Sequence, residues 1–308
     1  MRNAFAKQLT ALGEQDERIV LLSGDIGNRM FDDFKQRCPG RFFNCGIAEG
    51  NMMSMAAGLA MSGMRPVVYT ITPFVTTRCL EQIRVDVCYH RVPVVIMGVG
   101  GGLAYASLGA THHSCEDIGF LRLLPNMAVV CPGDAVETRA ALKAAIACEH
   151  GVYVRLGKKG EPEVHSGDID FELGKAIVLA KGKQVTLVST GNMLPVAVEA
   201  ADLLQADGIE AGVASMHTVK PLDTGFLNQA FASCEVVVTV EEHSAIGGLG
   251  GAVAEWLSEQ EVAGAKLLRI GTADHFLHEA GNQQHARECY QIDAASIVER
   301  ILSLESRL

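Results

Sequence analysis

The chain has 308 residues, of which 48% are hydrophobic and 20% charged, a length that suggests about two domains and a composition that excludes disordered and collagen-like chains. Its 26 basic and 36 acidic residues give a net charge of −10, so we expect no binding to nucleic acid or to a membrane surface. No apolar run reaches the roughly 18–20 residues of a membrane span, and no signal peptide is apparent. The nine cysteines are scattered, which argues against a disulfide scaffold and a zinc ribbon and predicts a cytoplasmic protein.

Short Val- and Ile-rich runs alternate with helix-length stretches in the first half of the chain. The predicted strands are residues 18–23, 41–45, 66–71, 93–99, 127–131 and 152–155. The predicted helices are residues 3–13, 51–62, 76–90, 116–124 and 134–150. Because the strands show little polar alternation, both faces of their sheet should be covered, which indicates an α/β domain with a mostly parallel sheet.

A polar segment at 157–171, rich in Gly and charged residues, predicts a linker between a first domain at 1–156 and a second at 172–308. The second half repeats the α/β alternation. Its predicted strands are residues 185–189, 211–215, 236–240 and 266–270. Its predicted helices are residues 194–205, 225–231, 248–259 and 294–304.

Segment 44–53 (NCGIAEGNMM) places one carboxylate, Glu49, at the start of a helix, after a predicted strand and a turn at Gly46. The flanking residues are apolar or small, so burial would favour the protonated carboxyl. Such a group can share a proton with a ring nitrogen of a bound heterocycle. The structural alternative is that the helix dipole alone favours Glu at this position.

Two histidines, His112 and His113, lie in segment 109–117 (GATHHSCED), just before a predicted helix. Histidine exchanges protons near neutral pH, so this loop can contact substrate oxygens. Alternatively, Ser114 and Asp117 cap the helix and both histidines face solvent. A metal site is a further alternative, but adjacent histidines rarely point the same way.

Phe74 lies in a strand-to-helix turn, where it can stack on a flat ring or simply pack in the core. In the second half, segments 219–223 (VKPLD) and 241–250 (EEHSAIGGLG) stand out. The glycines of the latter bring a helix N-terminus near an anion or form a tight turn. No P-loop, hydrolase-elbow or zincin motif occurs.

The ordered set GIAE, EQIR, GATHH–ED, LRLLPNM, VVCPGD–ET, VKPLD and EEH–GGLG resembles the C-terminal half of transketolase. It is also similar to deoxyxylulose-phosphate synthase and to the beta subunits of 2-oxo-acid dehydrogenases. The resemblance covers essentially the whole chain. It implies two consecutive α/β domains, a thiamine-diphosphate pyrimidine-binding domain followed by a transketolase C-terminal domain.

The resemblance also implies roles for individual residues. Glu49 would bond the pyrimidine nitrogen of thiamine diphosphate and drive the tautomer that deprotonates the thiazolium carbon, which attacks a substrate carbonyl. The implied cofactor contacts are Glu49, Phe74, Ile71 and Gln82, and no residue of this chain would bind the metal. The implied substrate contacts are His112, which is also catalytic, His113, Tyr105 and, for a phosphate group, Arg155.

The same resemblance implies a partner. The superfamily holds the cofactor's diphosphate and Mg²⁺ with a GDG motif followed by Asn, and none of the Gly-Asp pairs in this chain continues as GDG. A diphosphate–magnesium unit needs oxygen ligands. We therefore expect an N-terminal transketolase-like subunit to bind Mg²⁺, with the active site between chains and a heterotetrameric assembly.

Three positions depart from the transketolase pattern: Gly100 replaces His, Leu108 replaces an acidic residue and Ile71 replaces an aromatic one. The lost histidine and the lost acidic residue normally bond sugar hydroxyls, and each loss weakens recognition of a common ketose by roughly 1–2 kcal/mol. Either the donor is not a common ketose phosphate, or Tyr105, Ser107 and His113 replace these contacts. The first hypothesis is a split transketolase that moves a two-carbon ketol unit from a ketose to an aldose. The second is a 2-oxo-acid decarboxylating subunit or an acyloin-forming synthase. The third is a non-catalytic scaffold subunit, which the presence of Glu49 disfavours.

Overall fold

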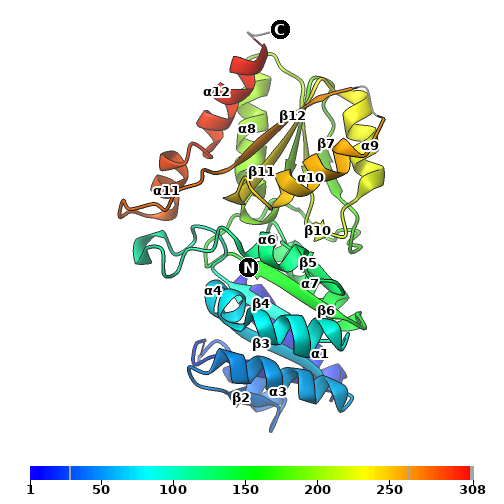
Figure 1. The fold of residues 1–308 in the computed structure, drawn as a ribbon, viewed down its shortest axis with the longest axis vertical. Coiled ribbons are helices and arrows are strands. Elements are labelled where there is room, and N and C mark those ends of the chain that lie inside the picture. The colour runs from blue at the N-terminus through cyan, green and yellow to red at the C-terminus, as the bar shows by residue number, and fades with distance from the viewer. Residues whose placement is uncertain (28, 262–263, 306–308) are drawn as a thin grey trace.

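Two α/β domains follow one another along the chain and are stacked end to end (Figure 1). The computed structural model describes residues 1–27, 29–261 and 264–305. None of the helices in this described part has the length and apolar character of a membrane span. The α/β fold class predicted from the sequence is confirmed.

The sheet of the first domain has the strand order β10-β5-β6-β4-β3-β1-β2 in the described residues. Its strands are β1 (Ile19–Ser23), β2 (Phe42–Asn44), β3 (Arg65–Ile71), β4 (Val95–Val99), β5 (Met127–Val130), β6 (Gly151–Leu156) and β10 (Thr218–Lys220). All neighbouring pairs are parallel except β10 with β5. Strands β1, β4, β5 and β6 are buried along their whole length, which explains why their sequences are mostly apolar.

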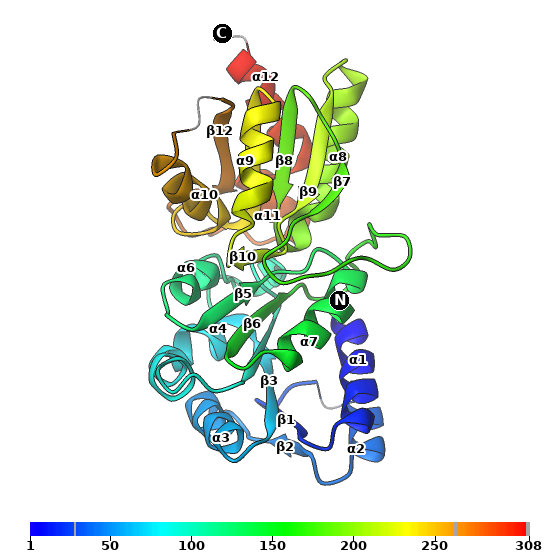
Figure 2. The same ribbon diagram turned by 90° about the vertical axis from the view of Figure 1, so that its right-hand side faces the viewer.

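Helices cover both faces of this sheet (Figure 2). One face packs against α1 (Arg2–Gln15), α2 (Asp32–Arg37) and α7 (Ala135–Ala147). The other packs against α3 (Glu49–Met61), α6 (Asp117–Arg122) and the helical turns that follow β3. Buried aromatic rings fill the first of these layers, where Phe5 stacks on Tyr69 at 5.4 Å between ring centroids.

The helix predicted at 76–90 is broken into short pieces. They are the 3₁₀ turn η1 (Thr77–Cys79), α5 (Leu80–Gln82) and the π-helix η2 (Ile83–Tyr89), and the unpredicted α4 (Thr72–Val75) precedes them. Thr76 marks the first break, because its hydroxyl donates to the carbonyl of Thr72 and its backbone leaves the helical region. This break brings Phe74 and Arg78 toward the N-terminal end of α3.

The second domain has the strand order β12-β11-β8-β9-β7 in the described residues. Its strands are β7 (Ile177–Ala180), β8 (Val185–Ser189), β9 (Ala211–Ser215), β11 (Val236–Ser244) and β12 (Lys266–Thr272). Only β7 runs antiparallel to its neighbour. Its helices are α8 (Leu194–Ala206), α9 (Thr224–Ser233), α10 (Leu249–Ser258), α11 (Gln283–Cys289) and α12 (Ala294–Glu305), and a 3₁₀ turn lies at η4 (Gly191–Met193). A further 3₁₀ turn, η3 (Ala106–Leu108), belongs to the first domain.

Strand β10 joins the two domains. It comes from the second half of the chain but pairs with β5 of the first sheet. The ammonium of Lys220, at its end, donates to the carbonyl oxygens of Arg122 and Leu124 at 2.9 and 2.5 Å. The domains therefore share a sheet edge as well as a connecting segment.

Candidate active site

Glu49 is the first residue of α3, reached from β2 through a turn at Gly46, whose φ is +68°. That left-handed backbone suits glycine, and it lets the chain reverse before the helix begins. The Glu49 side chain is 3% exposed, and its Oε1 accepts a hydrogen bond from Nη1 of Arg78 at 3.0 Å. The sequence predicted the burial of this carboxylate. The cation that pairs with Glu49, Arg78, lies outside segment 44–53, in η1.

Arg78 links Glu49 to an aromatic cluster. Its guanidinium lies 4.2 Å from the ring centroid of Phe74, and its side chain is 46% exposed. The Phe74 ring in turn meets the ring of His112 edge-on at 5.3 Å. The Nδ1 atom of His112 is 2.9 Å from the hydroxyl of Thr111, which fixes the orientation of the ring. Glu49, Phe74 and His112 thus lie in one continuous row.

Tyr105 extends the row on the far side of His112, with 6.0 Å between the ring centroids. Its ring fills the space beside Gly100, where an added Cβ would lie only 2.0 Å from a ring carbon of Tyr105. Burial raises the pKa of the Tyr105 hydroxyl, which keeps it a hydrogen-bond donor at neutral pH. The ammonium of Lys158 lies 4.6 Å from the centre of the same ring.

Two other predicted cofactor residues lie close by but make less specific contacts. The carboxamide of half-buried Gln82 packs against the first turn of α3, where a Cβ added to Gly50 would be 3.7 Å away. Ile71, the last residue of β3, packs partly buried against the core layer of α1 and α7. Ile71 therefore shapes the end of the strand that leads into α4, the helical turn that carries Phe74.

His113 points away from His112. Its Nε2 lies 3.2 Å from the carbonyl oxygen of Ala106, and the residue lines a separate cavity of about 260 Å³ with Tyr290 and His275 of the second domain. The structure therefore does not bring His113 into the row formed by Glu49, Phe74 and His112.

Arg155 is also placed differently from the prediction. Its side chain is 3% exposed, and its Nε donates to Oδ2 of Asp117 at 2.8 Å. Its Nη2 donates to the carbonyl oxygens of Ser114 and Glu242 at 2.8 and 2.9 Å. The predicted phosphate contact is not supported, because this guanidinium is enclosed by the protein and committed to it.

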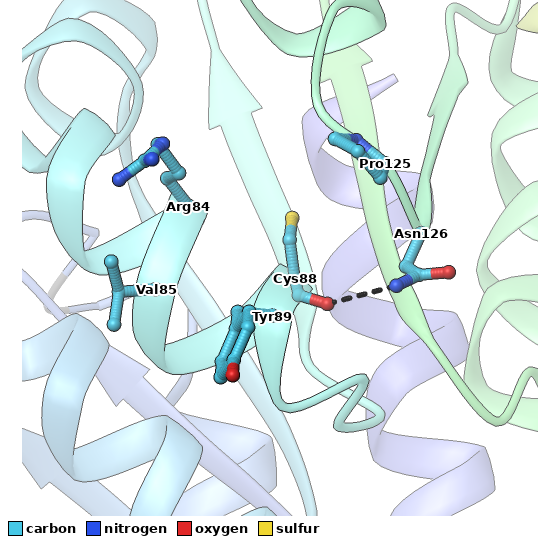
Figure 3. Close-up of a pocket in the computed structure, with 6 residues that line it drawn as sticks. All are labelled: Arg84, Val85, Cys88, Tyr89, Pro125 and Asn126. Carbon is cyan, nitrogen blue, oxygen red and sulfur yellow. Dashed lines mark hydrogen bonds between the residues drawn. The ribbon is translucent and has the colours of Figure 1, made fainter.

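A cavity of about 460 Å³ lies elsewhere in the first domain, between η2 and the turn before β5 (Figure 3). Its lining residues are Arg84, Val85, Cys88, Tyr89, Pro125 and Asn126. Asn126 donates to the carbonyl oxygen of Cys88 at 3.1 Å, as the dashed line in Figure 3 marks. No predicted site residue lines this cavity, and it offers no carboxylate or imidazole for proton transfer.

Metal-binding geometry is not found in the described residues, where no three His, Cys, Asp or Glu side chains lie close enough to hold an ion.

Residues 1–161 match the pyrimidine-binding domain of transketolase, and residues 174–297 match the transketolase C-terminal domain. The chain belongs to the transketolase family. The family resemblance expected from the sequence motifs is thereby confirmed.

Individual relatives in the transketolase family match the chain end to end. One subunit of the apulose-4-phosphate transketolase of Phocaeicola vulgatus is 41% identical over 304 residues, covering 98% of this chain and 96% of the relative. The 6-deoxy-6-sulfo-D-fructose transketolase subunit SqwH of a Clostridium species is 36% identical over 299 residues, covering 97% and 92%. A solved structure described as a split gene transketolase, inactive beta4 tetramer, superposes with a TM-score of 0.89 at 41% identity, covering 98% of this chain and 96% of that one.

Sequence reasoning did not assign Arg78 and Lys158 to the site of this transketolase-family chain. Arg78 follows Phe74 by only four residues, so its closeness to Phe74 was available as a signal. Lys158 follows the carboxyl end of β6, the edge of a parallel sheet where ligands gather. To use either observation, one must know where β3 and β6 end, and a sequence predicts strand ends only to within a few residues.

Proposed function

We propose that the chain is the pyrimidine-binding subunit of a two-subunit, thiamine-diphosphate-dependent transketolase. Its membership of the transketolase family makes it a subunit of a ketol-transferring enzyme. The observation that carries the assignment of a working site is Glu49, a buried carboxylate at a helix start, which Arg78 connects to the ring of Phe74. A scaffold subunit has no need of a charged group buried there.

The residues around Glu49 fit the pyrimidine ring of the cofactor. The planar guanidinium of Arg78 already bonds Glu49 and lies over the face of Phe74, so the site accepts a flat, nitrogen-bearing group. Thiamine diphosphate, when bound, supplies a nucleophilic carbon and an electron sink. Glu49 would hold a proton at a pyrimidine nitrogen, Phe74 would stack on the ring, and Gln82 and Ile71 would complete its surroundings.

His112 is proposed to contact the substrate. Its ring lies between Phe74 and Tyr105, and the hydroxyl of Thr111 contacts Nδ1. The other ring nitrogen, Nε2, can therefore bond a substrate oxygen. An N–H of the imidazole can donate a hydrogen bond to such an oxygen. His112 would therefore stabilise charge that develops on oxygen as the carbon–carbon bond is made or broken.

The partner subunit is proposed to hold the cofactor's diphosphate and Mg²⁺, because this chain has no GDG motif. Large apolar side chains at the edge of the site support a covering chain: Ile47, two residues before Glu49, is 81% exposed, and Leu108 in the His112 loop is 51% exposed. We propose two copies of each subunit in a heterotetramer. All nine cysteines are free thiols, which fits a cytoplasmic setting.

An acidic ketose and an aldose are the proposed substrates. Both relatives named above act, by their names, on a sugar with a phosphate or sulfo group. Arg155 is enclosed, whereas the ammonium of Lys158 lies over the ring of Tyr105 at the end of the row. An ammonium there can bind the acidic group of a sugar whose carbonyl faces His112.

The test is reconstitution with the partner chain, thiamine diphosphate and Mg²⁺. The complex is expected to transfer a ketol unit from a ketose phosphate to an aldehyde, with no carbon dioxide released. Release of carbon dioxide from a 2-oxo acid, with no transfer from any ketose, would instead establish the decarboxylating alternative. That outcome would overturn the proposed reaction.

A further inference from the structure

Glu242 forms a buried junction between the domains. It lies in β11 of the second domain, and its side chain is fully buried. Its Oε1 accepts from the backbone N–H of Leu103 at 2.8 Å and from Asn192 at 3.0 Å. Its carboxylate also accepts from Gln283, and its Oε2 from Nε of Arg287 at 2.5 Å. One carboxylate therefore joins two separate segments of the second domain, η4 and α11, to one backbone amide of the first.

The amide that it holds begins the substrate loop, which we define as residues 103–113. The loop is closed at its base by Gly102 and Ser114, which exchange two backbone hydrogen bonds of 2.8 and 2.9 Å. Within it lie Tyr105 and His112, the two rings proposed to contact substrate. The geometry of this base therefore sets the positions of both rings.

Gly102 allows Glu242 to approach this closely. The φ of Gly102 is +67°, and a Cβ there would lie 2.5 Å from Oε1 of Glu242 and 2.6 Å from its carbonyl oxygen. No side chain fits at that distance, so glycine is required on the loop side of the contact.

The other end of the substrate loop is tied to the same strand. Nη2 of Arg155 donates to the carbonyl oxygens of Ser114 and Glu242, and Asp117 holds the guanidinium in place. Both ends of the loop are thus fixed to β11 at Glu242, one through its side chain and one through its backbone.

We propose that Glu242 is a positioning residue for ketol transfer, which fixes the substrate loop so that His112 and Tyr105 meet the sugar. What the loop binds rests on the proposed function; that Glu242 fixes the loop rests on the contacts above. The second domain thereby controls the sugar site, whereas the proposed cofactor contacts on α3 and α4 lie outside its hydrogen-bond network.

Glu242→Gln is the informative substitution. Glutamine keeps the size of the side chain and can still accept from Leu103, but its amide loses the ion pair and cannot satisfy every donor around it. Glu235→Gln is the matched control, because this carboxylate is exposed and lies immediately before the same strand.

The experiment measures steady-state kinetics of the full complex with its partner, and hydrogen–deuterium exchange of each variant. For Glu242→Gln we expect the KM for the sugar to rise about tenfold, with the KM for thiamine diphosphate nearly unchanged. Exchange should accelerate in peptides that span residues 103–113 and stay unchanged in peptides of α3. Glu235→Gln should behave as the unsubstituted protein.

Equal increases in the KM for the sugar and the KM for thiamine diphosphate would overturn the proposal, because they would indicate a general loss of structure. Unchanged hydrogen exchange in the substrate loop would overturn it as well. If the complex has no ketol transferase activity, the proposed function fails, but the exchange measurement still decides whether Glu242 fixes the loop. If Glu242→Gln fails to assemble, Arg287→Gln removes the same ion pair and leaves the carboxylate. It should accelerate loop exchange in the same peptides, and unchanged exchange overturns the proposal.

Discussion

Arg78 holds Glu49 by a single hydrogen bond of 3.0 Å between Nη1 and Oε1, at the start of α3. The guanidinium of Arg78 lies 4.2 Å from the ring centroid of Phe74. A flat cation therefore uses the same carboxylate and the same aromatic face that we propose for the pyrimidine of the cofactor. The cofactor and Arg78 compete for Glu49 on this account.

Arg78→Gln is therefore expected to tighten binding of thiamine diphosphate to the assembled enzyme. The ion pair is half-exposed, so its removal is worth at most about 1 kcal/mol, or roughly a fivefold decrease in Kd. Calorimetric titration of the complex with the cofactor measures this. Arg84→Gln, which removes an exposed arginine paired with Glu81, is the control. Weaker binding in Arg78→Gln would mean that Arg78 contacts the cofactor rather than competing with it.

Gly100 and Tyr105 should be coupled in stability. Gly100 has a φ of +78°, and its missing side chain is the space that the Tyr105 ring occupies. Gly100→Ala should lower the free energy of unfolding by about 1–3 kcal/mol through backbone strain and the clash with the ring. Denaturant unfolding measures the change.

The double variant Gly100→Ala with Tyr105→Ala separates the two causes. Without the Tyr105 ring, the alanine at position 100 no longer clashes, but its backbone strain remains. The loss of stability caused by Gly100→Ala should therefore be smaller in the Tyr105→Ala background, with a coupling energy of about 1 kcal/mol in the double-mutant cycle. Strictly additive losses would show that Tyr105 does not depend on the glycine.

Lys158→Met should weaken binding of an acidic sugar. Loss of a charge-assisted hydrogen bond to a phosphate or sulfo group predicts about a tenfold increase in KM for the sugar, with kcat little affected. Lys159→Met, one residue further along and exposed, is the matched control. If the two variants have the same kinetic constants, the acidic group is bound elsewhere, on this chain or on the partner.

Stability should fall as the pH rises from about 6.5, the ordinary pKa of histidine, to about 7, the folded pKa of the two buried carboxyls. Burial raises the pKa of Glu137 to about 7, and the carboxylate of Asp134, 3.0 Å from Nδ1, raises the pKa of His165. Both groups bind protons more tightly in the folded state, so the stability that they contribute is lost as the pH passes their folded pKa values. Burial likewise raises the pKa of Glu241 to about 7 and acts in the same direction.

Denaturant unfolding at a series of pH values measures this slope. Glu137→Gln removes one of the titrating groups and should flatten the decline without abolishing it. A free energy of unfolding that rises between these pH values would contradict the assignment.

The sheet cores were predictable because β1, β4, β5, β6 and β8 are buried on both faces and are therefore mostly apolar. Strand β10 was not predicted, because three residues carry too little pattern and its partner strand belongs to the other domain. The short helices α2 and α11 and strand β7 were missed for the same reason of length.

Site residues divide in the same way. Glu49 and its burial followed from local sequence, since the small and apolar flanks lie within a few positions of it. The position of Arg155 did not, because its partners Asp117 and Glu242 are 38 and 87 residues away. Whether an arginine at a strand end faces a ligand or a buried carboxylate is decided by such distant contacts.

The central claim is that Glu49 tunes the cofactor, and Glu49→Gln in the fully assembled complex tests it most directly. Glutamine keeps the shape of the side chain but cannot hold the proton as a carboxyl group does. We predict a fall in kcat of about 10²–10⁴-fold with thiamine diphosphate and Mg²⁺ saturating, while the subunits remain assembled. A turnover rate equal to that of the unsubstituted enzyme would contradict the account.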